Sequence, residues 1–172
     1  MELHERLSAK LSKFRPSVTL GLKHLVCERQ AKGLPVFDFG LGETKGRLDD
    51  AIREAGERAF REEHTMYADP GGMPELRAAV LTWLNLEEFY RVENVVISAG
   101  AKQSLFNTFL SVCNPADCVL FDSAPWVSYQ PLATAAYAFP VQVLPKAQKE
   151  ENLKVTAEDL RRNLSMRPHA KL

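Results

Sequence analysis

The sequence is poor in the residues that mark several common classes of protein. Of its 172 residues three are cysteine and four are histidine, and neither type is spaced as paired metal ligands. We therefore expect no disulfide framework and no metal site, and we expect thiols in a reducing compartment. Basic and acidic residues are balanced at 22 each, so no charged footprint indicates nucleic acid or an anionic membrane as a partner.

Long apolar runs are missing as well. No stretch reaches membrane-spanning length, and charged residues alternate near the N-terminus, where a signal peptide would carry an apolar segment. These absences predict a cytoplasmic protein with no membrane partner. The length suits one domain with a sizeable core or a piece of something larger, and the composition is that of a globular protein.

We expect the other elements to be arranged around the stretch Val95–Phe106. Its β-branched start predicts a strand over 95–97, and the small residues of 98–101 lead into a helix that ends near Cys113. The first turn of a helix has free N–H groups and a partial positive charge, and small side chains let a phosphate approach them. A strand, a turn with a glycine and a helix are also common scaffold, so this turn alone leaves both interpretations open.

Helical and strand patterns alternate along the rest of the chain. Trp83 falls on the apolar face of a helix and is expected in the core. Strands are predicted over 35–39, 118–121 and 141–143, with another beginning near His169; helices are predicted over 1–16, 17–32, 49–63, 74–84, 132–136 and 156–165. This alternation predicts an α/β fold that binds ligands at the carboxyl ends of its strands.

Four motifs, in order and at matching spacing, resemble the N-terminal part of class I/II aminotransferases, the fold-type I pyridoxal-phosphate enzymes. They are FGLGE at 39–43, YADPGGMPELR at 67–77, SAGAKQSL at 98–105 and PWVSY at 125–129. The resemblance covers about Ser17 to Leu164. It implies a three-layer α/β/α fold with a mainly parallel, incomplete sheet. Residues 1–34 would be an N-terminal arm and helix, and 35–172 part of the large, cofactor-binding domain.

The resemblance also implies roles for single residues. The turn of Gly100, Ala101 and Lys102 would hold the phosphate of pyridoxal 5'-phosphate through backbone N–H groups. Trp126 would stack on the pyridine ring, although it could also fill an apolar gap. Lys102 fits neither a P-loop nor the position of the lysine that forms the family's Schiff base.

Two further residues carry implied roles outside this turn. The tyrosine matching Tyr67 reaches the phosphate of the neighbouring subunit, which implies a homodimer, and the glycine matching Gly42 lies against the substrate carboxylate. Each has a plainer alternative, a capped loop for Tyr67 and a turn for Gly42. The chain departs from the family at 44–46, where Thr-Lys-Gly replaces Pro-Asp-Phe, and at Pro125, where tyrosine is usual.

No catalytic residue of the family has a match in this chain. The lysine that carries the cofactor, the aspartate that pairs with the pyridine nitrogen and the arginine for the substrate carboxylate belong to segments that would follow Leu172. Amino transfer needs an amine to form the aldimine, an acid group that keeps the pyridinium protonated and a base that moves the Cα proton, and this chain offers none of them at a matching position. We therefore expect an N-terminal fragment, a truncated reading frame or a shortened isoform, poorly stable by itself because its sheet is incomplete.

The function implied by the resemblance is pyridoxal-phosphate-dependent amino transfer between an amino acid and a 2-oxo acid. One alternative is a non-catalytic dimerisation or phosphate-binding module. Another is a lyase or decarboxylase, which the same fold supports. The motifs do not indicate which amino acid is the substrate.

Overall fold

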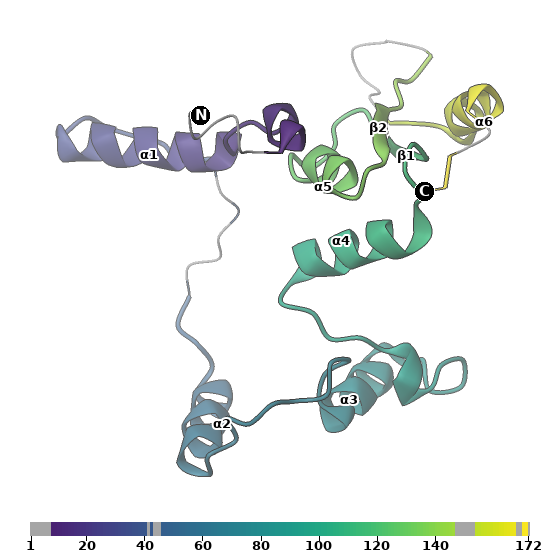
Figure 1. The fold of residues 1–172 in the computed structure, drawn as a ribbon. Coiled ribbons are helices and arrows are strands. Elements are labelled where there is room, and N and C mark those ends of the chain that lie inside the picture. The colour runs from purple at the N-terminus through teal and green to yellow at the C-terminus, as the bar shows by residue number, and fades with distance from the viewer. Residues whose placement is uncertain (1–7, 41, 43–45, 147–153, 168–169, 172) are drawn as a thin grey trace. The chain divides into compact units, whose positions relative to one another are not determined.

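The computed structural model describes residues 8–40, 42, 46–146, 154–167 and 170–171 (Figure 1). The chain forms two compact units: a helical unit of Pro16–Ile97, and a sheet unit of Met1–Arg15 with Ser98–Leu172. The described elements are the 3-10 helix η2 (Ala9–Lys13), α1 (Val18–Ala31), α2 (Asp50–Arg61), α3 (Pro74–Leu84), the 3-10 helix η3 (Val92–Asn94), α4 (Ala101–Val112), β1 (Cys118–Phe121), α5 (Tyr129–Ala135), β2 (Phe139–Gln142) and α6 (Ala157–Met166).

The sheet unit is built on a β–α–β arrangement. Strands β1 and β2 pair in parallel, with Cys118 opposite Phe139 and Phe121 opposite Gln142. Helix α5 connects them, as parallel strands require a crossover. This confirms the predicted parallel pairing and the strand at 118–121. The second strand begins at Phe139, earlier than the predicted Val141.

A third backbone segment pairs with β1 near the end of the chain. Cys118 forms a parallel bridge with Ala170, and the Lys171 N–H donates to the Cys118 carbonyl at 3.0 Å. Because Cys118 also pairs with Phe139, β1 lies between the two partners. The prediction that the chain begins another strand here is confirmed at Ala170, while 168–169 and 172 lie outside the described residues.

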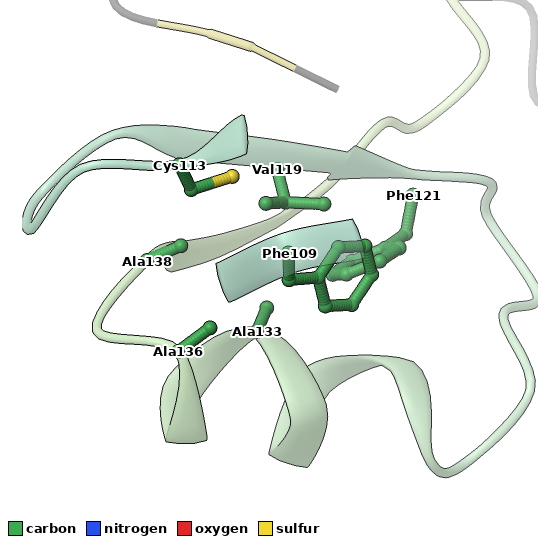
Figure 2. Packing of buried hydrophobic residues seen from close by; sticks show 7 residues of the cluster. All are labelled: Phe109, Cys113, Val119, Phe121, Ala133, Ala136 and Ala138. Atoms are coloured by element: carbon green, nitrogen blue, oxygen red, sulfur yellow. The ribbon is translucent and has the colours of Figure 1, made fainter. Parts of the chain in front are cut away.

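The core of the sheet unit lies between α4, α5 and β1. Phe109 and Cys113 lie four residues apart, on the same face of the α4 segment. Figure 2 shows Ala133 of α5 and Ala136, the residue that caps it, directed toward this face, and their small side chains leave room for the Phe109 and Phe121 rings. The buried cluster comprises Phe109, Cys113, Val119, Phe121, Ala133, Ala136 and Ala138.

Helix α6 begins at the predicted capping box. The Thr156 hydroxyl accepts from the Asp159 N–H at 3.2 Å, and the Asp159 carboxylate accepts from the Thr156 N–H at 3.1 Å and from its hydroxyl at 2.7 Å. The same carboxylate accepts from the Lys146 N–H at 2.9 Å. Asp159 thus ties α6 to the segment that follows β2.

The helical unit has the predicted helices but little core. Asp49 caps α2 by accepting from the Ala51 N–H at 2.8 Å, and Pro74 opens α3. Gly33 has a φ of +67°, as expected for a glycine that ends α1. Leu81 is the one buried apolar side chain among the described residues of this unit.

Several predictions for the helical unit are wrong. Segments 35–39 and 95–97 form no strand, because an extended segment becomes a strand only when a neighbour supplies a ladder of hydrogen bonds. Among the described residues, segment 95–97 makes one backbone hydrogen bond to a distant segment, from the Ile97 N–H to the Gly71 carbonyl at 2.8 Å. Trp83 is not in the core, since 81% of its surface is exposed. The apolar face predicted for α1 is not buried either: Val18, Leu22 and Leu25 are exposed, and Val26 is half-buried.

The N-terminal prediction is met in part. A helix was predicted over 1–16, and the described part contains only the short 3-10 helix Ala9–Lys13, while residues 1–7 lie outside the described residues. Among the residues that the structure describes, no helix is long and apolar enough to cross a membrane. The division into an arm at 1–34 and a domain at 35–172 stays a prediction.

Candidate cofactor site

The start of α4 is an open turn. Gly100 caps the helix with φ +84° and ψ 166°, a conformation that is available to glycine and strained for other residues. A Cβ built on Gly100 would meet nothing within 4 Å. The backbone here is therefore accessible to a bound group.

Two backbone N–H groups of this turn have no acceptor in the part of the chain that the structure describes. The Gln103 and Ser104 N–H groups reach the Gly100 carbonyl at 3.1 and 3.4 Å. For the N–H groups of Ala101 and Lys102, no acceptor lies among the described residues. Unpaired donors at an open helix N-terminus form a site suited to an anion. We call Gly100, Ala101 and Lys102 the phosphate turn.

Gln103 supports this turn, a role that the sequence analysis missed. Its side-chain oxygen accepts from the Ala99 N–H at 2.5 Å. The signal was available, since glutamine at the third helical position commonly bonds back to the residues before the helix. The bond fixes the backbone on the N-terminal side of the phosphate turn.

An aromatic ring lies beside the phosphate turn. The Lys102 ammonium is 5.0 Å from the centre of the Trp126 ring, within the range of a cation–π interaction. Trp126 is 43% exposed, so part of its surface is free to contact a ligand. The structure thus brings together four of the six predicted site residues.

Tyr129 anchors Trp126 to the core, and the sequence analysis did not single it out. The rings of Trp126 and Tyr129 meet edge to face at 5.6 Å, and Tyr129 stacks on Phe121 at 5.6 Å. The sequence signal was the spacing of three residues between the two aromatics. Upstream, the Gln142 amide donates to the Ser123 carbonyl, which ties the loop before Trp126 to β2.

Cys113, the buried thiol of the core, is not a reactive nucleophile. Burial raises the pKa of the Cys113 thiol, and the Asp117 carboxylate raises it further, against a smaller opposite effect of Lys171. Cys113 therefore stays a neutral thiol near pH 7. Within the part of the chain that the structure describes, no three potential metal ligands cluster together.

Tyr67 and Gly42 belong to the helical unit. The Tyr67 side chain is fully exposed, and a Cβ on Gly42 would meet nothing within 4 Å. Their roles toward cofactor and substrate stay predictions. Of the positions that depart from the family, Thr44 and Lys45 lie outside the described residues, and Gly46 is exposed.

A family model described as "Aminotransferase class I and II" matches residues 35–172, most of the chain. The chain belongs to the class I and II aminotransferases. Enzymes of this family generally use pyridoxal phosphate. The phosphate turn and Trp126 fit that group, because they offer a phosphate N–H donors that no described residue occupies, beside a partly exposed aromatic surface.

Curated relatives are similar to almost all of this aminotransferase chain. It is 36% identical over 170 residues to a probable aspartate/prephenate aminotransferase of Aquifex aeolicus, covering 98% of this chain and 43% of the relative. It is also 36% identical to a bifunctional aspartate and glutamate/aspartate-prephenate aminotransferase of Petunia hybrida, covering 89% of this chain and 32% of the relative. The chain thus spans less than half the length of these relatives.

A solved structure confirms the fold class. The aspartate aminotransferase of Thermus thermophilus with maleate superposes with a TM-score of 0.83 at 29% identity, covering 95% of this chain and 42% of that one. The predicted incomplete α/β fold of an aminotransferase is therefore correct.

Proposed function

We propose that the phosphate turn and Trp126 bind pyridoxal 5'-phosphate. The observation that carries this proposal is that no described residue accepts from the N–H groups of Ala101 and Lys102, while the Lys102 side chain lies 5.0 Å from the Trp126 ring. Two donors converge on the phosphate, while the indole offers a flat surface to the ring. Neither feature alone would distinguish a phosphorylated aromatic compound from a simple anion.

The residues of this chain orient the cofactor. When bound, pyridoxal phosphate supplies an electron sink that makes bonds at the α-carbon of an amino acid labile. The N–H groups of Ala101 and Lys102 fix one end of the molecule, and the Lys102 ammonium adds positive charge near the phosphate. Trp126 sets the plane of the ring because Tyr129 holds its edge.

We propose that the whole protein transfers an amino group from an amino acid to a 2-oxo acid. Both relatives described above carry aspartate and prephenate in their names, so aspartate is the proposed donor and prephenate the proposed acceptor. Gly42 would contact the substrate carboxylate. The relatives described above are named as aminotransferases, which supports amino transfer over the lyase or decarboxylase alternative.

The proposed assembly is a homodimer in the cytoplasm. Tyr67 would donate its hydroxyl to the phosphate held by a second copy of the chain. Its fully exposed side chain suits a contact with another molecule. The alternative of a non-catalytic, phosphate-binding dimer shares this geometry, and only amino transfer distinguishes the two.

The binding test uses pyridoxine 5'-phosphate, which has no aldehyde to react with surface lysines. In a Trp83→Phe background, Trp126 is the one tryptophan left, so its fluorescence reports on the site. We expect saturable quenching by pyridoxine 5'-phosphate, much weaker quenching by pyridoxine, and loss of the difference in Gly100→Val. Equal affinity for the two compounds would contradict a phosphate site.

Activity is tested on this chain joined to the C-terminal part of the Aquifex aeolicus relative. We expect transfer of the aspartate amino group to prephenate, measured as oxaloacetate formed, and no transfer by the 172-residue chain alone. A joined protein that is folded and binds the cofactor, yet transfers nothing, would favour the non-catalytic alternative.

A further inference from the structure

We infer that Arg77 is a positioning residue for Tyr67. It would act through Asp69, by holding the loop of residues 67–72 that presents the tyrosine. The inference rests on the role proposed for Tyr67 in binding phosphate. It assigns to Arg77, the last residue of the second sequence motif, a task that does not require contact with cofactor or substrate.

Arg77 is the best-enclosed charged side chain of this loop region. Only 12% of the side chain is exposed, and its Nε donates to the Val92 carbonyl at 2.9 Å. Its Nη1 lies 3.5 Å from the Asp69 carboxylate. A guanidinium with so little access to water needs such partners, so the side chain is held in one place.

Asp69 passes this constraint to the loop backbone. The carboxylate oxygen that faces Arg77 also accepts from the Gly71 N–H at 2.7 Å, and the Gly72 N–H donates to the Asp69 carbonyl at 2.8 Å. Together these bonds close a tight turn. The guanidinium also lies close to the Gly71 backbone, since a Cβ there would be 3.1 Å from Arg77 Nη1.

The far side of the turn is fixed by Ile97. The Gly71 carbonyl accepts from the Ile97 N–H at 2.8 Å. Gly72, at φ +100°, lies so close that an added Cβ would be 2.6 Å from the Ile97 side chain. The turn therefore lies between Arg77 and Ile97 and contacts both. Of the two contacts, only the one with Arg77 involves a charged side chain.

Tyr67 lies two residues before Asp69, and its fully exposed side chain is held by no described residue. The position of its hydroxyl is set by the backbone alone. A change at Arg77 would thus release the loop and let Tyr67 occupy many positions, each contributing less to phosphate binding. Binding would then have to order the loop, and the lost conformational entropy would weaken the affinity for phosphate.

The first test measures the loop directly, with no ligand. Limited digestion with chymotrypsin is followed by mass spectrometry, and the rate of cleavage after Tyr67 is divided by the rate after the exposed Phe37 of the same unit. Global unfolding raises both rates and leaves the ratio unchanged. For Arg77→Met we expect the ratio to rise roughly tenfold, as for the loss of a hydrogen bond to a charged group.

Matched variants sharpen this test. Arg77→Lys keeps the charge without the planar donors and should give an intermediate ratio, whereas Arg58→Met removes an exposed arginine of α2 and should give the original ratio. Asp69→Asn keeps an acceptor for the Gly71 N–H and should raise the cleavage ratio less than Arg77→Met does. If Arg77→Met does not fold, Asp69→Asn provides the test in its place. An unchanged ratio in both the Arg77 and Asp69 variants would overturn the inference.

The second test is a double-mutant cycle on the affinity for pyridoxine 5'-phosphate. If Arg77 acts through Tyr67, then Arg77→Met and Tyr67→Phe each weaken binding about threefold to tenfold, and the double variant is no weaker than Tyr67→Phe. Additive losses would overturn the inference. Unchanged affinity in Tyr67→Phe would instead overturn the proposed role of Tyr67, while the cleavage ratio still decides whether Arg77 holds the loop.

Discussion

The ammonium group of Lys102 lies 5.0 Å from the centre of the Trp126 ring. The two residues are far apart in sequence, one in the first turn of α4 and the other in the loop between β1 and α5. Their contact brings the phosphate turn, whose Ala101 and Lys102 N–H groups have no described acceptor, next to an aromatic surface. It is the relationship on which the proposed cofactor site depends.

Replacing Lys102 by methionine should weaken the link between α4 and this loop. An exposed cation–π pair contributes roughly 0.5–1 kcal/mol, so a double-mutant cycle of Lys102→Met with Trp126→Leu should give a coupling free energy of that size. Urea denaturation of the four proteins measures it. A coupling indistinguishable from zero would show that the two side chains do not interact in solution.

Gly100→Ala should be destabilising and should reduce phosphate binding. The site has space for a methyl group, so the cost comes from φ +84°, and strain at such a position amounts to about 1–3 kcal/mol. Relief of the strain would also turn the Ala101 N–H away from the ligand. Denaturation and titration with inorganic phosphate check both effects, and unchanged affinity would remove Gly100 from the site.

Gly72→Ala should destabilise the helical unit more strongly, because both backbone strain and a collision at 2.6 Å with Ile97 oppose it. Gly21→Ala is the matched control. Gly21 lies inside α1 with nothing within 4 Å of an added Cβ, so alanine should stabilise the helix by about 0.5–1 kcal/mol. Opposite shifts of the denaturation midpoint are expected, and shifts of equal sign would contradict this account.

The Asp159 carboxylate should make stability depend on pH in the acid range. Hydrogen bonds from Thr156 above all, then from Lys146, and the nearby Arg162 charge hold its pKa below the usual value. A group with a lowered native pKa stabilises the fold above its unfolded pKa of about 3.9, and loses this effect as the pH falls through the native value. Asp159→Asn should therefore be less stable at pH 7, and the gap should narrow below pH ~4. A gap that stays constant between pH 7 and pH ~3 would rule out this linkage.

Two of the three cysteines, Cys27 and Cys113, should differ in reactivity. Cys113 is buried with a raised pKa, whereas Cys27 is exposed on α1. With iodoacetamide near pH 7 we expect Cys27 to be alkylated first and Cys113 only after unfolding in urea. Peptide mapping by mass spectrometry gives the order, and equal rates in the folded chain would mean that the α4 to β1 core opens readily.

Helix boundaries were largely predictable from sequence because the signals that set them are local. Asp49, Pro74 and Thr156 each act within three residues of their own position, and α2, α3 and α6 begin where these residues place them. The four motifs carried the family assignment in the same way, since they require only order and spacing. The turn at Gly100 was likewise visible as a change from β-branched to small residues.

Contacts between distant segments were decided only by the tertiary structure. The apolar run at 95–97 has the composition of a strand, yet among the described residues only one of its backbone hydrogen bonds reaches a distant segment, and it stays irregular. Trp83 lies on a helical face that nothing described covers. No periodic pattern in the sequence predicts that Val92 and Asp69 enclose Arg77. Nor does one predict that Lys102 lies close to Trp126. A capping bond depends on neighbours along the chain, whereas burial, strand pairing and side-chain enclosure depend on which remote groups the fold brings into reach.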